Sequence, residues 1–84
     1  MFYVYVLKSL KTGTFYKGLT NNLERRIKQH ELGQCSSTRK ILPITLIHVE
    51  ICSNRTEARK MEKYLKSGYG REIIEELFER NLKI

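Results

Sequence analysis

FYVYVLKSLKTGTFYKGL, residues 2–19, predicts a β-hairpin near the start of the chain. Aromatic and β-branched residues dominate Phe2–Lys8, and residues of these types favour strands. Lys11–Thr14 is typical of a turn, because Gly13 can adopt a positive φ without steric penalty. Phe15–Leu19 then provides a second short strand, which we expect to pair with the first.

The rest of the chain predicts one more strand and three helices. Thr20–Asn22 and Asn54 offer side chains that cap helix N-termini, and Glu57 stands three residues after Asn54, as in a capping box. Gly33 ends the first helix. In chain order we expect a helix over 23–32, a loop over 34–40, a strand over 44–52, a helix up to about residue 67, a break over 68–70 and a helix over 72–81. This order, β-β-α-β-α-α, predicts a single α/β domain over residues 1–84, with a three-stranded sheet flanked by helices.

The composition favours a small basic domain that binds a polyanion. The 84 residues are 40% apolar, enough for one small core. Sixteen Lys and Arg against nine acidic residues give a net charge of +7, which is typical of nucleic-acid binding, although charge can also serve solubility alone. Residues 1–49 carry eight basic and two acidic side chains, and residues 50–84 carry eight and seven. We therefore expect the binding surface on the first hairpin, the first helix and the loop.

The acidic residues and cysteines exclude several kinds of site. All nine acids are Glu, which excludes EF-hand loops and nuclease sites built on Asp clusters. Cys35 and Cys52, with His30 and His48, match no zinc-finger spacing, and Cys52 is expected to be a buried thiol. The sequence has no candidate membrane span and no signal-peptide pattern, so we expect reduced thiols, no membrane partner and a cytoplasmic location.

Glu62 occupies an unusual position on its predicted helix. Ala58, Met61 and Leu65 form the inward stripe of that helix, and Glu62 lies on or beside it. A buried carboxylate needs a partner, a metal ion or a function. The alternative is an edge position from which the carboxylate reaches solvent.

Other polar side chains also lie near the expected interior. Arg26 and His30 are four residues apart and flank the inward face of the first helix, unless they form an ordinary half-exposed basic face. Tyr5 and Tyr16 lie on the two hairpin strands, where tyrosines most often serve packing. Together with Glu62, these residue types suit phosphodiester hydrolysis: a cation for the phosphate, a carboxylate for a divalent metal ion and a base for water.

The motifs and their order resemble the GIY-YIG nuclease family, in particular its short stand-alone type related to the nuclease domain of the bacterial excision-repair incision subunit. Tyr3-Val4-Tyr5 corresponds to the first triplet, and Tyr16-Lys17-Gly18 to the second. The stretch 22–30 matches the helix with its Arg and following His, and 57–63 matches the Glu-Ala-x-x-x-Glu helix. Residues 66–71 resemble the end of the short type. The chain departs from the pattern at Lys17, where an aliphatic residue is usual, and it lacks the late Asn of some members.

The resemblance implies a role for each matching side chain. Glu62 would coordinate a single Mg²⁺ or Mn²⁺ ion, and Arg26 would stabilise the transition state. Tyr5 and Tyr16 would position or deprotonate the attacking water, with the choice between them left open, and His30 would assist. The nucleic-acid backbone would be bound by Lys17, Arg25, Arg39 and Lys40.

The resemblance therefore implies a metal-dependent DNA endonuclease. A domain of this size has little surface for sequence readout, so we expect selectivity for DNA structure, or weak specificity, in a monomer that a protein partner could target. One alternative is a non-catalytic nucleic-acid-binding module with the same fold. Another is an adaptor that binds protein through Ile74, Leu77 and Phe78, a set that suits a core better.

Overall fold

The computed structural model describes the backbone of residues 1–81 and the side chains of residues 1–76. Three antiparallel strands form one sheet in the order β2-β1-β3. The elements are β1 (Phe2–Ser9), β2 (Phe15–Thr20), α1 (Leu23–Glu31), α2 (Ser36–Arg39), β3 (Ile44–Cys52), α3 (Arg55–Lys66) and α4 (Gly68–Asn81). The predicted class and element order are confirmed, with α2 as one added short helix.

The hairpin forms where the sequence predicts it. Gly13 lies in the turn with a φ of 76°. The hydroxyl of Ser9 accepts hydrogen bonds from the backbone N–H groups of Lys11, at 3.2 Å, and Thr12, at 2.9 Å. β1 is the central strand of the sheet. Since successive side chains of a strand alternate, those of β1 point to the two opposite faces.

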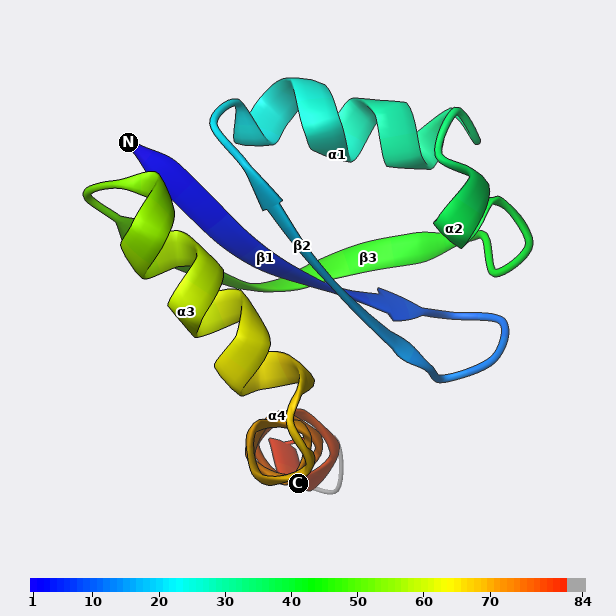
Figure 1. Cartoon of the computed structure of the whole chain (residues 1–84). Helices are drawn as coiled ribbons and strands as arrows, with labels where there is room; N and C mark the ends of the chain where they lie inside the picture. Colours follow the sequence, from blue (N-terminus) through cyan, green and yellow to red (C-terminus); the bar gives the residue numbers. More distant parts are fainter. Residues whose placement is uncertain (82–84) are drawn as a thin grey trace.

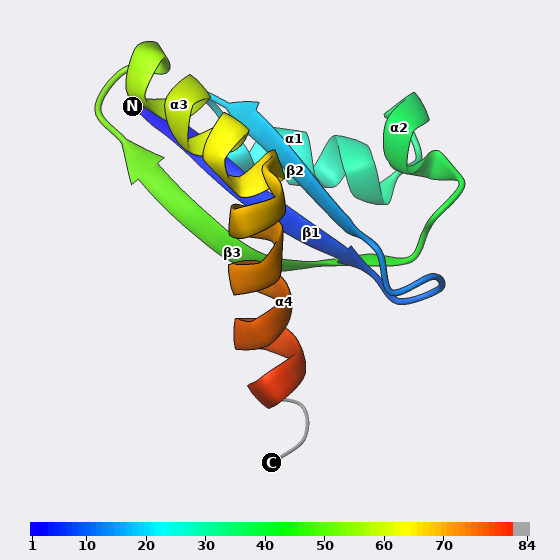
Figure 2. The ribbon, with the colours of Figure 1, turned by 60° about the horizontal axis from the view of Figure 1, so that its bottom comes forward.

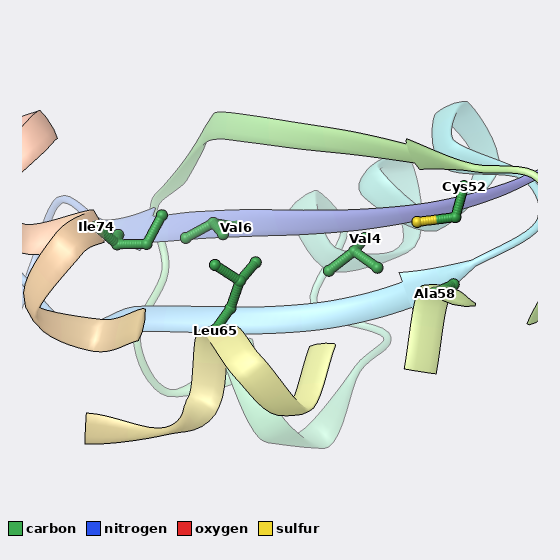
Figure 3. Close-up of a cluster of buried hydrophobic side chains, with 6 residues drawn as sticks. All are labelled: Val4, Val6, Cys52, Ala58, Leu65 and Ile74. Atoms are coloured by element: carbon green, nitrogen blue, oxygen red, sulfur yellow. The ribbon is translucent and has the colours of Figure 1, made fainter. Parts of the chain in front are cut away.

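Helices cover both faces, with α1 and α2 on one side of the sheet and α3 on the other (Figure 1). The apolar core lies between the sheet and the pair α3 and α4. Val4 and Val6 of β1 pack there with Ala58 and Leu65 of α3 and Ile74 of α4 (Figure 3). Cys52 joins this cluster as a buried free thiol, as predicted.

The stretch Gly68–Gly70 begins α4, so the break predicted there was wrong and the helix starts four residues earlier than expected. The chain changes direction at Ser67, whose ψ is 160° and whose hydroxyl accepts a hydrogen bond from the backbone N–H of Gly70 at 3.2 Å. A Cβ atom on Gly70 would collide with the carbonyl oxygen of Tyr64. Glycine therefore lets α4 begin directly against the end of α3, from which it continues towards the C-terminus (Figure 2).

The apolar side predicted for the last helix is described only in part. Ile74 is buried and Ile73 is half-buried, so Ile74 belongs to the core and not to a free surface. Leu77 and Phe78 lie outside the residues whose side chains the structure describes.

The stretch 34–40 contains α2 and was wrongly predicted as a loop. The backbone N–H groups of Thr38 and Arg39 both donate to the carbonyl of Cys35, at 3.2 and 3.0 Å. Four residues are too few to show a helical period in the sequence. The fully buried Thr38 side chain instead fixes this turn through a tertiary contact.

Candidate active site

Tyr5 lies at the centre of the sheet and is 1% exposed. It points away from Val4 and Val6, towards α1, because successive side chains of a strand alternate. Its hydroxyl lies 2.9 Å from Nε2 of His30, and the two rings meet edge to face with their centroids 5.6 Å apart. The first triplet therefore places a buried phenol in direct contact with the first helix.

Gly18 provides the space for this phenol. It is paired with Tyr5 across β1 and β2, and a Cβ atom at this position would collide with the Tyr5 ring. The glycine of the second triplet is thus required for close approach, and its φ is not positive. This steric role was not evident from the sequence.

His30 is the buried residue of α1, a helix that the structure describes in full. Its Nδ1 lies 2.7 Å from the hydroxyl of Thr38 in α2, and Thr38 is 0% exposed. Both ring nitrogens of His30 therefore have hydroxyl partners, one on β1 and one on α2. The chain Tyr5–His30–Thr38 joins three elements by side-chain hydrogen bonds.

The surroundings of this hydrogen-bonded chain keep both of its titratable side chains, Tyr5 and His30, neutral near pH 7. Burial lowers the pKa of His30, and the positive charge of Arg26 lowers it further. Burial also raises the pKa of Tyr5 to about 12, although the neighbouring Arg26 guanidinium opposes that rise. A neutral imidazole has one donor and one acceptor. All groups are satisfied when Tyr5 donates to Nε2 and Nδ1–H donates to Thr38.

Tyr16 lies on the same face as Tyr5 but is only half-buried. Its ring centroid is 6.5 Å from that of Tyr5 and 5.2 Å from that of His30. Within the described residues, its hydroxyl makes no hydrogen bond. Of the two predicted tyrosines, Tyr16 is therefore the one whose hydroxyl is free to meet a substrate or water.

Arg26 joins this cluster to an open hollow on the surface. Its guanidinium donates to Oε1 of Gln29 at 3.1 Å, and its proximity to Tyr5 raises the pKa of Arg26, so it is fully charged. The hollow beside it has a volume of about 320 Å³. It is lined by Phe2, Leu19, Thr20, Asn21, Arg25, Arg26, Gln29 and Arg55. Three arginines from two helices thus line one concave site.

Glu62 lies on α3 and is 18% exposed. It forms an ion pair with Lys66 at 3.5 Å, four residues further along the helix. In the part of the chain that the structure describes, Glu62 forms no ion pair with Arg26. Glu62 therefore lies at the edge of the inward stripe of α3, with a half-exposed lysine as its partner. Within the described residues it makes no hydrogen bond or ion pair with the cluster formed by Tyr5, Tyr16, Arg26 and His30.

This donor set suits one kind of metal site. Among the residues that the structure describes, no three His, Cys, Asp or Glu side chains lie together. An ion at Glu62 would therefore be held by one carboxylate, water and substrate oxygens, which is how Mg²⁺ commonly binds at phosphate-processing sites. The residues fit Mg²⁺ or Mn²⁺ and do not form a cage for a structural metal ion.

The predicted backbone-binding residues occupy different environments. Arg25 is exposed and lines the hollow beside Arg26. Arg39 and Lys40 are exposed, and Nε of Arg39 donates to the carbonyl of Gly33 at 2.9 Å. Lys17 is 8% exposed on the opposite face, where burial lowers its pKa and Arg71 adds to that effect. Lys17 therefore does not lie on the surface that contains the cluster, because successive side chains of β2 alternate between the two faces.

Comparison with known proteins identifies the family. Residues 1–75 match the model of the GIY-YIG catalytic domain. The chain belongs to the GIY-YIG family. Members of this family are nucleases that generally depend on a divalent metal ion, and the resemblance inferred from the motifs is confirmed.

The relatives are UPF0213 proteins, which carry the GIY-YIG domain on its own. One from Clostridium perfringens is 46% identical over 68 residues, which cover 79% of this chain and 71% of the relative. One from Haloquadratum walsbyi is 34% identical over 83 residues, covering 98% and 91%. The solution NMR structure of a UPF0213 protein from Bacillus halodurans is similar to this GIY-YIG domain with a TM-score of 0.55 and 33% identity, over 92% of this chain and 85% of that chain.

Two residues of the candidate site gave no recognisable signal in the sequence. Thr38 lies in a stretch of polar residues that gives no periodic signal, although it is the second partner of His30. Arg55 lies in the second half of the chain, where the near balance of charges concealed a basic cluster.

None of the described helices is long and apolar enough to span a membrane.

Proposed function

We propose that this GIY-YIG domain is a divalent-metal-dependent endonuclease that hydrolyses DNA phosphodiester bonds. The observation that carries the proposal is the buried His30, which holds the Tyr5 hydroxyl beside Arg26 while Tyr16 stays open on the same face. A domain selected for stability alone would favour an apolar residue at the buried position of α1. The family and the hollow that contains Arg26 support the same activity.

Tyr16 is the better candidate to position the attacking water, and to deprotonate it as the phenolate once its own proton has passed to solvent. Its hydroxyl has no hydrogen-bond partner within the described part of the chain, so it can accept a bond from water. Tyr5 keeps its proton, because its pKa is raised to about 12 and its hydroxyl is held by His30. We assign Tyr5 to positioning: its oxygen orients the Arg26 guanidinium and its ring supports Tyr16.

Arg26 would bind the scissile phosphate and stabilise the charge that develops on it. Its guanidinium is permanently charged and can donate two parallel hydrogen bonds to phosphate oxygens. His30 would act indirectly, by fixing the hydroxyl of Tyr5 next to Arg26. The neutral state of His30 avoids a second buried positive charge next to the arginine.

Glu62 would hold the Mg²⁺ or Mn²⁺ ion. When bound, such an ion neutralises charge on the phosphate and stabilises the leaving oxygen. Lys66 would release the carboxylate readily, because its own side chain is more than half exposed and ion pairs at this helix spacing contribute only about 0.3–0.5 kcal/mol. The ion pair would thus keep Glu62 ordered without competing strongly with the metal ion.

We propose DNA as the substrate, bound electrostatically by Arg25 beside the hollow and by Arg39 and Lys40 at the end of α2. Lys17 is left out of this set because it is buried on the other face. The relation to the excision-repair nuclease supports a role in DNA repair, and we expect a cytoplasmic monomer with structure-selective or weak specificity. Its biological partner for targeting is a separate question from the chemistry.

The test is a cleavage panel with single-stranded, duplex, flap and branched DNA in Mg²⁺ or Mn²⁺. The proposal predicts metal-dependent cleavage of at least one substrate, with loss of cleavage in Glu62→Gln. The matched control is Glu57→Gln on the same helix, which removes a carboxylate that accepts a hydrogen bond from Ser53. Binding without cleavage of any substrate would favour the non-catalytic nucleic-acid-binding alternative.

A further inference from the structure

The outer side of α3 carries a row of exposed cations that the sequence analysis did not assign. We name Arg55, Arg59, Lys60 and Lys63 the α3 basic stripe. All four are exposed, and all four line a second surface hollow of about 350 Å³, together with Thr56. Within the described residues, none of the four forms an ion pair. A row of unpaired cations on one helix face concentrates positive potential there.

The α3 basic stripe continues from the candidate active site. Arg55 lines both hollows, the one that contains Arg25 and Arg26 and the one on α3. Figure 1 and Figure 2 both show α3 starting near the N-terminal end of β1, where Phe2 lines the first hollow. The positive surface therefore runs from α1, past the start of α3, and along the outer side of that helix.

We propose that the α3 basic stripe binds the phosphate backbone of the DNA substrate outside the cleavage site. The proposal rests on the proposed function for the identity of the polyanion. From Arg55 to Lys63 the helix rises about 12 Å, at 1.5 Å per residue. One DNA strand advances about 3.4 Å along the duplex axis per nucleotide. The stripe thus spans about three or four nucleotides.

The apolar residues of α3 favour nucleic acid over a membrane surface. A helix that lies on a membrane buries an apolar face in the lipid. The apolar face of α3 is already used, because Ala58 and Leu65 are buried in the core. What remains on the outer side is charged and polar, which suits backbone phosphates.

The test compares two double variants of equal net charge. Arg59→Ala with Lys63→Ala removes two cations of the stripe. Lys8→Ala with Arg71→Ala removes two cations, on β1 and α4, that line neither hollow. Affinity for a labelled duplex of about 20 base pairs is measured in EDTA between about 50 and 200 mM salt, where each phosphate contact contributes about 0.9 to the slope of log K against log salt.

The stripe variant should flatten the slope by about 1.8, so that its affinity falls about 12-fold less than that of the parent over this salt range. The control variant should leave the slope close to that of the parent. Equal changes in the two variants would overturn the proposal, since net charge alone would then explain them. Salt-dependent binding to phosphatidylserine vesicles that is lost in the stripe variant, with DNA binding unchanged, would assign the stripe to membranes instead.

A parallel cleavage assay separates this proposal from the proposed function. With protein in excess over DNA and Mn²⁺ present, the stripe variant should cleave at the parent's saturated rate but need more protein to reach it. If the stripe variant shows the flatter slope but the parent never cleaves DNA, the nuclease proposal fails and the stripe proposal stands. If the parent cleaves and the slopes are unchanged, the stripe fails and the nuclease proposal stands.

Discussion

The two tyrosines of the site should respond in opposite ways to loss of the hydroxyl. In Tyr5→Phe the ring still fills its place against Gly18, but Nε2 of the fully buried His30 loses its partner at 2.9 Å. A buried polar group left without a partner costs about 1–3 kcal/mol. For a domain of this size, each kcal/mol lowers Tm by about 4–8 °C.

Tyr16→Phe removes a hydroxyl that is not hydrogen-bonded within the described residues, from a half-buried ring. Its free energy of unfolding should change by no more than about 0.5 kcal/mol. If Tyr16 is the general base, cleavage should fall by about 10²–10⁴. Tyr5→Phe should show the smaller loss of cleavage under conditions in which it is folded.

Guanidinium denaturation in EDTA and single-turnover cleavage in Mn²⁺, both below the Tm of each variant, provide the two readouts. The double variant is the control, because its stability should equal that of Tyr5→Phe if Tyr16 has no structural hydrogen bond. A Tyr5→Phe protein as stable as the parent, together with a Tyr16→Phe protein that cleaves normally, would refute the assignment of both residues.

Four further outcomes are expected. Arg26→Lys should bind DNA nearly as well as the parent in a titration, but cleave about 10²–10³ times more slowly, because lysine lacks the planar fork. Glu62→Gln should abolish cleavage. Its free energy of unfolding in EDTA should change by less than about 0.5 kcal/mol, since it loses only the pair with Lys66. A loss of several kcal/mol would indicate a structural role for Glu62. Thr38→Val should lower Tm, because Nδ1 of His30 loses its partner. Folding lowers the pKa of His30, so the stability that neutral His30 contributes is present above about pH 6.5 and is lost as pH falls through its folded pKa. Denaturation curves measured across this pH range should show the decline in the parent and a smaller decline in His30→Gln.

The fold was predictable where one element supplies its own periodic signal. β1 and β3 each have a run of β-branched residues, and their predicted bounds differ from the observed ones by at most one residue. The start of α4 was not predictable in this way, because glycine disfavours helices on average. Gly70 is there for a tertiary reason, the close approach to Tyr64, which appears only when α3 and α4 meet.

The side chains of the site were predictable as candidates, but their partners were not. Two-residue alternation along one strand accounts for Lys17 lying opposite to Tyr16, but the common face of Tyr5 and Tyr16 depends on the register between two strands. The partner of Glu62 could not be assigned, because periodicity within one helix does not establish which side chains of other elements approach it. Balanced charge over residues 50–84 hid the α3 basic stripe for a related reason: a sum over sequence does not record which side chains share a face.

The two faces of the sheet differ in kind: one packs in the apolar core, and the other carries the hydrogen-bonded polar cluster. On one face, apolar side chains such as Val4 and Val6 pack against α3 and α4 and form the apolar core cluster. On the other face, the buried side chain of α1 is a histidine, and its contact with Tyr5 is a hydrogen bond. An apolar residue in place of His30 would add to the core and leave the Tyr5 hydroxyl without a partner. The polar face is therefore stable only as a complete network, which fixes the phenol and the adjacent guanidinium in the orientation that the proposed hydrolysis would require.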